Sequence, residues 1–246
     1  MAGSEIQSIV WDENSCVRIL DQTRLPAREE YLECRDMHAV MDAIRRLSIR
    51  GAPAIGIAGA LALALESEKS DAADAGAFMA EIEKKANSIE QVRPTAVNLK
   101  CALDRLINKA RNHAGDGVDP LKSIIKKEAL RIYQADLEIN RAIGEQGQAV
   151  LPRRATVMTI CNTGSLATGG HGTALGVVRT GITTGKDLHV VVCETRPLLQ
   201  GARLTCWELQ KSGIPCTLIT DSAAAYYMIK REVDLIIIGA DRIAAN

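Results

Sequence analysis

The apolar residues of the first 150 positions recur mostly at the three- and four-residue spacing of amphipathic helices. The first helix is predicted to begin after Asp36, whose side chain suits an N-cap, and to continue through Leu47. The second, from Ala54 to Glu66, is apolar on nearly every side, which predicts a buried helix. Further helices are predicted over about 73–90, 94–112 and 120–148.

A β-hairpin is predicted ahead of these helices. The runs Gln7–Val10 and Cys16–Leu20 are rich in aliphatic residues, and the turn-forming segment Asp12–Ser15 lies between them. At the other end of the helical part, Gly144 and Gly147 weaken the helical preference. We therefore expect the last helix to fray at these glycines.

After Pro152 the pattern changes to short runs rich in Val and Ile, separated by helical stretches. The runs are predicted strands, at Ala155–Ile160, Leu188–Cys193, Cys216–Ile219 and Asp234–Ile238. The helices between them are predicted at about 172–180, 199–211 and 222–231. This alternation predicts right-handed crossovers and a parallel sheet with helices on both faces. The fold class is α/β, with a mainly helical domain over 1–150 and a Rossmann-like domain over 151–246.

The last predicted strand is followed by few residues, 239–246. A parallel strand buried on both faces needs covering helices, and none follows in this sequence. We therefore expect the Rossmann-like domain to be incomplete at its C-terminus and the chain to be a fragment of a longer protein. Such a fragment is expected to be poorly soluble or partner-dependent, and to have little activity alone.

Composition and charge argue against several classes of protein. Hydrophobic residues make up 47% and charged residues 24% of the chain, as in ordinary globular proteins. Thirty basic and 30 acidic residues give a formal net charge of zero, without the basic excess of nucleic-acid binders. The N-terminal residues lack the features of a secretory signal, and no apolar run is long enough to span a bilayer. We expect a cytoplasmic protein that binds neither nucleic acid nor membrane.

The seven cysteines have no pairing pattern. Their number is odd and no Cys-x-x-Cys sequence occurs, which argues against a disulfide framework and against a zinc site. Cys193, Cys206 and Cys216 lie within or beside predicted strands and helices, where a free cysteine usually acts as a small buried hydrophobe. Cys161 differs, because it follows a predicted strand and opens a glycine-rich loop.

The loops that follow the four predicted strands are the candidate site, because ligands of open parallel sheets bind beyond the carboxyl ends of the strands. Cys161 begins one of these loops, among backbone N–H groups that can stabilise a thiolate. Asp241 follows the last strand and is placed to act as a general acid or base facing Cys161. A structural role stays open for both residues, as a buried thiol and as a turn cap.

A dinucleotide-binding loop is an alternative interpretation of the segment after Cys161. Its glycines are out of register with the required pattern, because Leu175 stands where the last glycine belongs and Gly176 follows one position late. The cysteines and histidines nearby lack metal-ligand spacing. We therefore expect no nicotinamide cofactor and no metal.

Two arginines precede predicted helix starts. Arg50 stands before Gly51–Pro53, and Arg93 stands before Pro94. An arginine beside the exposed N–H groups of a helix start favours binding of a phosphate group. Arginines at helix starts are also often plain surface residues, so the spacing alone leaves both interpretations open.

Six segments of the chain, taken in order, resemble those of the methylthioribose-1-phosphate isomerase family. They are Arg50–Ile55, Arg93–Asn98, Cys161–Thr168, Glu194–Pro197 with Gln200–Thr205, Ile219–Ser222 and Gly239–Arg242. The resemblance extends from about residue 6 to the last residue, and the six together are far more specific than any one. Regulatory subunits of translation initiation factor 2B and ribose-1,5-bisphosphate isomerases share the fold of this family.

The resemblance implies an isomerase of methionine salvage that converts 5-methylthioribose 1-phosphate into 5-methylthioribulose 1-phosphate without metal or cofactor. It implies Cys161 and Asp241 as the catalytic pair. It further implies a homodimer whose small-molecule sugar phosphate is bound by Arg50, Gly51, Ala52, Arg93 and Gln200.

Other interpretations of the chain stay open. It could be a non-catalytic regulatory or scaffold subunit of the initiation factor 2B type, a ribose-1,5-bisphosphate isomerase, or an inactive fragment of the enzyme. The fragment interpretation arises because the family continues into an Asn-Lys pair that contacts substrate.

The reaction also has two possible routes, since a phosphate on O1 prevents simple opening to an aldehyde. Asp241 would assist ring opening while Cys161 moves the C2 proton, or a hydride would shift in a dry pocket.

Overall fold

The structure, a computed structural model, describes residues 6–12, 15–230, 232–240 and 243–245. Its internal contacts divide the chain into two units. The helical unit comprises Ser8–Thr23 and Glu29–Asp136, and the sheet unit comprises Met1–Gln7, Arg24–Arg28 and Leu137–Asn246. The domain boundary near residue 150 stays a prediction, because this division follows contacts and falls between residues 136 and 137.

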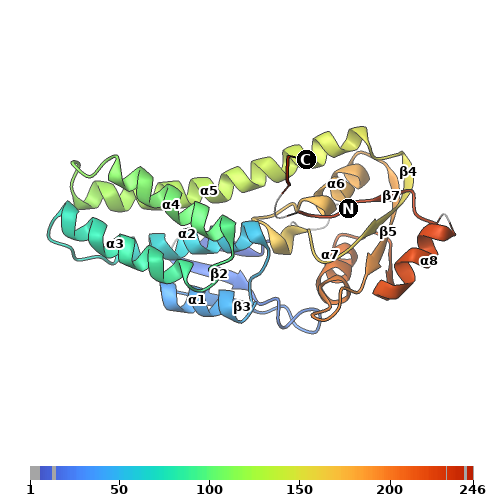
Figure 1. The fold of residues 1–246 in the computed structure, drawn as a ribbon, viewed down its shortest axis with the longest axis horizontal. Coiled ribbons are helices and arrows are strands. Elements are labelled where there is room, and N and C mark those ends of the chain that lie inside the picture. The colour runs from blue at the N-terminus through green and yellow to red at the C-terminus, as the bar shows by residue number, and fades with distance from the viewer. Residues whose placement is uncertain (1–5, 13–14, 231, 241–242, 246) are drawn as a thin grey trace. The chain divides into compact units, whose positions relative to one another are not determined.

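A small antiparallel sheet opens the helical unit (Figure 1). It contains β1 (Ile9–Asp12), β2 (Cys16–Leu20) and β3 (Tyr31–Cys34) in that order. The predicted hairpin is confirmed in the pairing of β1 with β2. The sequence pattern missed β3, because this strand has only four residues and charged residues precede it, which leaves its alternation too short to recognise.

The helices of this unit are α1 (Met37–Arg45), α2 (Ala52–Glu68), α3 (Ala75–Glu90), α4 (Val97–Arg111) and the first part of α5 (Val118–Gln146). The predicted N-cap is confirmed, since Asp36 Oδ1 accepts a hydrogen bond of 2.8 Å from the N–H of Ala39. As predicted, α2 is buried along almost its whole length, where small alanines allow neighbouring helices to approach. Within the described residues, no helix combines the length and apolar character needed to cross a membrane.

α5 ends at Gln146, where the chain passes into the 3₁₀ turn Gly147–Ala149, and the fraying of this end stays a prediction. A Cβ atom on Gly144 would lie 2.4 Å from Thr180 Oγ1, and one on Gly147 would lie 2.6 Å from a methyl carbon of Val177. Both contacts are with α6 (Ala174–Thr183). The two glycines therefore serve close packing, which overrides their low helical preference.

The sheet unit contains four parallel strands, β4 (Arg154–Thr159), β5 (Asp187–Cys193), β6 (Cys216–Ile219) and β7 (Leu235–Ile236). All four were predicted, although β7 is shorter than expected. Their order in the sheet is β6-β5-β4-β7. The chain therefore steps outward from β4 in one direction and returns to its other side, so that the topological switch point lies between β4 and β7.

Helices cover both faces of this sheet (Figure 1). Val157 and Val190 point to one face, where α6 and α7 (Cys206–Lys211) complete the core. The alternate residues Met158 and Val191 point to the other face, where α8 (Ala224–Ile229) packs. This alternation is the pattern of strands buried on both sides, and it confirms the predicted Rossmann-like arrangement.

Candidate active site at the carboxyl ends of the parallel strands

Hydrogen bonds join the loops that follow three neighbouring strands. The N–H of Cys161, after β4, donates to Thr195 Oγ1 at 2.7 Å. Thr195 follows β5, and its own N–H donates to Asp221 Oδ1 at 2.8 Å. Asp221 follows β6 and also accepts from the N–H of Arg196 at 2.7 Å. The prediction that these loops share one rim of the sheet is confirmed.

The loop after β7 reaches the same rim. A Cβ atom on Gly239 would lie 2.8 Å from Thr163 Cγ2, so the backbone of this residue passes directly beside the loop that Cys161 opens. This contact lies at the switch point between β4 and β7. Asp241 lies outside the described residues, and its pairing with Cys161 stays a prediction.

Cys161 has an unusual backbone held at both sides. Its φ of 62° lies in the left-handed region that non-glycine residues seldom adopt. Its N–H donates to Thr195, and its carbonyl oxygen accepts from Thr205 Oγ1 at 2.5 Å. Thr195 (φ 65°) and Leu199 (φ 57°) in the next loop share this backbone region. Such outliers persist only where the surroundings over-determine them, and they gather at functional sites.

The loop after Cys161 was expected to surround the thiol with unused N–H donors, and this expectation is wrong at several positions. The N–H groups of Ser165 and Leu166 donate to a buried carboxylate, that of Glu208. The N–H of Ala167 donates to the carbonyl oxygen of Gly164. Because the segment is buried, its N–H groups must bond to protein acceptors. Those of Ser165, Leu166 and Ala167 are therefore not available to stabilise a thiolate at Cys161.

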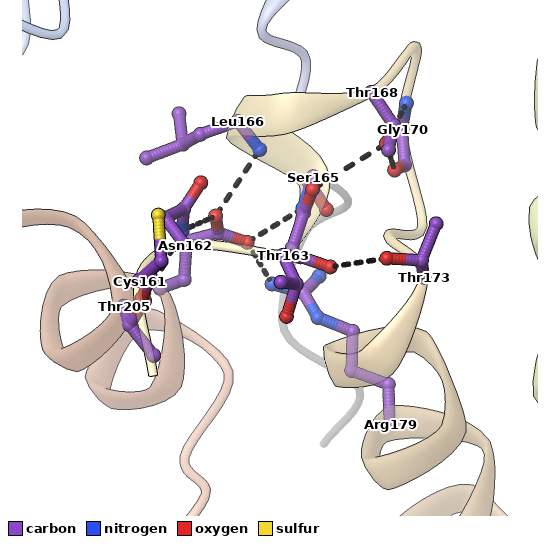
Figure 2. Close-up of polar contacts among 12 residues, drawn as sticks. Cys161, Asn162, Thr163, Ser165, Leu166, Thr168, Gly170, Thr173, Arg179 and Thr205 are labelled. Carbon is purple, nitrogen blue, oxygen red and sulfur yellow. Dashed lines mark hydrogen bonds and ion pairs between the residues drawn. The ribbon is translucent and has the colours of Figure 1, made fainter. Parts of the chain in front are cut away.

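Glu208, on α7, is the site residue that the sequence pattern did not identify. Figure 2 labels the four residues that donate hydrogen bonds to it, which are Asn162, Ser165, Leu166 and Arg179. It is fully buried. Its Oε1 accepts from Asn162 Nδ2 at 2.7 Å and from the N–H of Leu166 at 3.1 Å. Its Oε2 accepts from the N–H of Ser165 at 2.8 Å and from Arg179 Nη2 at 2.7 Å. A signal was present, since Glu208 lies four residues after Leu204, on the apolar side of its helix.

Gln200 lies between β5 and α7 and offers an unsatisfied acceptor. Its buried Oε1 has no hydrogen-bond partner among the described residues. The π-helical segment Gly201–Thr205 follows at once, and a Cβ atom on Gly201 would lie only 1.8 Å from the carbonyl oxygen of Cys193. Glycine is therefore required where this segment crosses the end of β5. A buried carbonyl without a partner can bind a ligand hydroxyl group.

The remaining predicted binding residues belong to the helical unit. Gly51 is the N-cap of α2, with a φ of 97° that explains the choice of glycine. No side chain caps this helix, so the N–H groups around Ala52 receive no side-chain acceptor from a cap. Arg50 is half-buried directly ahead of them. The backbone of this segment therefore has the features of an anion site.

The sequence pattern predicted a helix start directly after Arg93, at Pro94, and this prediction is wrong. α4 begins at Val97 with Ala96 as its N-cap, and Arg93 lies in a turn in which its carbonyl oxygen accepts from the N–H of Ala96 at 2.9 Å. The start of α4 packs near α2, since a Cβ atom on Gly56 would lie 3.0 Å from the carbonyl oxygen of Asn98. Arg93 and Arg50 thus precede two neighbouring helices of the same unit.

Among the other cysteines, Cys34, Cys193 and Cys206 are buried and Cys216 is partly buried, and the pKa of each is raised. Burial raises the pKa of Cys206 to about 12 and that of Cys34 to about 11, from an ordinary value of 9.0. Burial likewise raises the pKa values of Cys193 and Cys216. The predicted structural role of the cysteines in the sheet unit is confirmed. Among the described residues, no group of His, Cys, Asp and Glu side chains is arranged to hold a metal ion.

Comparisons with known proteins give consistent matches. The model of a family described as "Initiation factor 2 subunit family" matches residues 48–246. Methylthioribose-1-phosphate isomerase of Desulforamulus reducens is 51% identical over 241 residues, which cover 98% of this chain and 69% of that protein. The crystal structure of 5-methylthioribose 1-phosphate isomerase from Pyrococcus horikoshii OT3 has a TM-score of 0.92 at 40% identity, covering 98% of this chain and 67% of the other.

A third match carries a different name. The crystal structure of translation initiation factor eIF-2B, subunit delta, from A. fulgidus has a TM-score of 0.86 at 44% identity and covers 97% of this chain. This chain spans 69% of the length of that protein, as it does for the Desulforamulus relative.

Proposed function

This chain belongs to the initiation factor 2 subunit family, and from that membership we propose that it is an isomerase of 5-methylthioribose 1-phosphate. The observation that carries the proposal is the position of Cys161 at the switch point of a parallel sheet, in a chain so similar to enzymes of this name. The product is 5-methylthioribulose 1-phosphate, and the reaction belongs to methionine salvage.

Cys161 and Asp241 are the proposed catalytic pair. The reaction moves a hydrogen from C2 of the sugar to C1, so that C2 becomes the ketone carbon and C1 is reduced. Asp241 protonates the ring oxygen as the bond from this oxygen to C1 breaks, and the thiolate of Cys161 removes the C2 proton to give an enol. The Cys161 thiol then returns a proton to C1, and the Asp241 carboxylate takes the proton of the C2 hydroxyl as the ketone forms, which restores both residues. The hydrogen bonds from Cys161 to Thr195 and from Thr205 to Cys161 support this role, because they fix the backbone from which the thiol projects.

The other predicted residues bind the substrate. Arg50 and Arg93 neutralise its phosphate, and the N–H groups at Gly51 and Ala52 bind phosphate oxygens at the start of α2. The unsatisfied Oε1 of Gln200 accepts a hydrogen bond from a sugar hydroxyl. These roles rest on the resemblance of the segments and on the local geometry within each unit.

Substitution of the catalytic pair tests the proposal. With 5-methylthioribose 1-phosphate as substrate, Cys161→Ser and Asp241→Asn should each reduce kcat by about 10²–10⁴-fold. Cys101→Ser is the matched control, because Cys101 is an exposed cysteine on α4. Turnover by Cys161→Ser at the control's rate would remove Cys161 from the mechanism.

Isotopic labelling separates the two routes. Substrate deuterated at C2 is converted in ordinary water, and the deuterium content of the product at C1 is measured by NMR. Proton transfer through Cys161 loses deuterium to solvent, whereas a hydride shift keeps it. We expect loss, because a thiolate that removes a proton exchanges it with water.

A regulatory subunit of the initiation factor 2B type is the second candidate, because the A. fulgidus structure bears that name. Such a subunit would not turn over the substrate, so the same assay distinguishes the two.

We also propose that the enzyme is a cytoplasmic homodimer. Light scattering should then give twice the mass of one chain, and the mass of one chain would contradict the dimer.

A further inference from the structure

The loop formed by residues 161–168, here called the Cys161 loop, is a buried segment with little regular structure. Its one regular element is a single 3₁₀ turn, Ser165–Ala167. Asn162 and all residues from Gly164 to Thr168 are buried. Irregular backbone in a buried position cannot rely on water for hydrogen bonding, so its conformation depends on the protein groups that satisfy it.

Glu208 supplies the acceptors for this loop. Three of its four hydrogen bonds come from the Cys161 loop, through Asn162 Nδ2 and the N–H groups of Ser165 and Leu166. The fourth comes from Arg179 on α6, whose side chain is only 12% exposed and supplies the opposite charge. Each carboxylate oxygen accepts two hydrogen bonds, so the side chain acts only as an acceptor.

The loop is also shaped to pass directly over this carboxylate. A Cβ atom on Gly164 would lie 2.2 Å from Glu208 Oε2, so only glycine fits there. The segment Gly201–Lys211 makes a second contact, because Thr205 donates to the carbonyl oxygen of Cys161. One helical segment therefore holds the loop at its start and at its middle, and Gln200 immediately precedes this segment.

We propose that Glu208 is a positioning residue, which sets the place of the Cys161 thiol by holding the Cys161 loop in one conformation. The proposal rests on the proposed function, in which Cys161 is catalytic. A purely structural role explains the contacts less well, because the core of the sheet unit would tolerate an apolar side chain in place of an ion pair. What an apolar side chain cannot supply is the set of acceptors for the loop.

The test is the variant Glu208→Gln in the full chain, with Glu145→Gln on the exposed side of α5 as the matched control. Glutamine keeps the shape but replaces one acceptor oxygen by a donor. Each cysteine is alkylated with iodoacetamide over time and quantified by mass spectrometry. Trypsin releases Cys161 in the peptide 155–179 and the exposed Cys101 in the peptide 101–105.

The expected result is a local change. The alkylation rate of Cys161 relative to Cys101 should rise about tenfold as the loop opens, while buried Cys193 and Cys34 stay protected. In the isomerase assay kcat should fall about tenfold with KM little changed, because the thiol acts in the transition state. Glu208→Asp should recover part of the loss, since it restores both acceptor oxygens.

Two results would overturn the proposal. One is an unchanged alkylation ratio at Cys161, and the other is increased alkylation of every buried cysteine, which would mean that Glu208 only stabilises the unit. If Glu208→Gln does not fold, Asn162→Ala removes a single donor and should show the same local change to a smaller extent. If the unsubstituted chain has no isomerase activity, the proposed function fails, but the alkylation ratio still decides the role of Glu208.

Discussion

The two units each contain a carboxylate that joins separate segments, and these carboxylates differ in what they hold. In the helical unit, Glu66 on α2 accepts from the N–H of Met37 at 3.2 Å and pairs with Lys85 at 3.1 Å. It thereby links α2 to the start of α1, through Met37, and to α3, through Lys85. In the sheet unit, Glu208 accepts two N–H groups from an irregular loop and pairs with Arg179.

The two carboxylates also differ in their exposure to solvent, and this changes the energy of their ion pairs. The side chain of Glu66 is 13% exposed and that of Lys85 is 22% exposed, whereas Glu208 is fully buried. Burial disfavours the charge on Glu66, but hydrogen bonds from Lys85 and Met37 outweigh it, and its pKa lies below the ordinary value. Regular helices keep their backbone hydrogen bonds without such a carboxylate, but an irregular loop does not. A buried carboxylate beside a candidate site thus supports conformation, whereas Glu66 supports packing.

The largest expected effect follows from leaving Glu208 without its cation. Arg179→Met should lower the free energy of unfolding of the sheet unit by about 3–5 kcal/mol, because it leaves a buried charge unpaired. Urea unfolding can be followed by Trp207 in the sheet unit and Trp11 in the helical unit, each alone after changing the other to Phe. A loss below about 1 kcal/mol, typical of exposed pairs, would place Glu208 in the same class as Glu66.

Crowding of the carboxylate gives the next largest effect. Gly164→Ala places a methyl group 2.2 Å from Glu208 Oε2, so the loop must move. The cost should be about 2 kcal/mol, within the usual range for overpacking, and should appear in the Trp207 signal. Gly115→Ala in the helical unit is the control, because a Cβ atom there has no neighbour within 4 Å. Equal stability of the two variants would show that the loop is not confined by Glu208.

Much of this arrangement could be predicted from sequence, because it depends on local patterns. The runs of Val and Ile identified the four parallel strands, and their order along the chain placed Cys161 on the ligand-binding rim. The predicted start of α4 at Pro94 was wrong, because a proline suits a turn as well as a first helical turn.

The role of Glu208 could not be predicted for a different reason. Its four donors come from Asn162, Ser165, Leu166 and Arg179, which are 29 to 46 residues away in the chain. A helical pattern shows that Glu208 lies near the apolar side of its helix, but not which loop passes over it. Long-range hydrogen bonds leave no periodic signal, whereas the packing of regular elements does.

Alkaline pH should separate the units by a smaller effect. The pKa values of Cys34 (about 11) and Cys206 (about 12) exceed the ordinary 9.0, so each folded unit retains a proton that its unfolded form loses. The contribution of each thiol to stability is fully present below pH 9 and is lost as pH rises toward those values, by about 1.4 kcal/mol per pH unit. Cys206→Ala should flatten this fall in the Trp207 signal, and Cys34→Ala should flatten it in the Trp11 signal. Unchanged slopes would mean that these thiols are accessible to solvent.

The smallest expected effect lies in the helical unit. Lys85→Met removes the cation that Glu66 and Glu81 share, and should lower the free energy of unfolding at pH 7 by about 0.5–1 kcal/mol, because all three side chains contact solvent. The pKa values of both carboxyl groups lie below their ordinary 4.5, so their contribution is present above pH 4.5 and is lost as pH falls through the folded-state values. The difference between Lys85→Met and the unsubstituted chain should therefore shrink as pH falls below 4.5, as measured by Trp11 fluorescence in urea. A loss as large as that of Arg179→Met, or one independent of pH, would mean that the helical unit depends on the Glu66 ion pair as strongly as the sheet unit depends on that of Glu208.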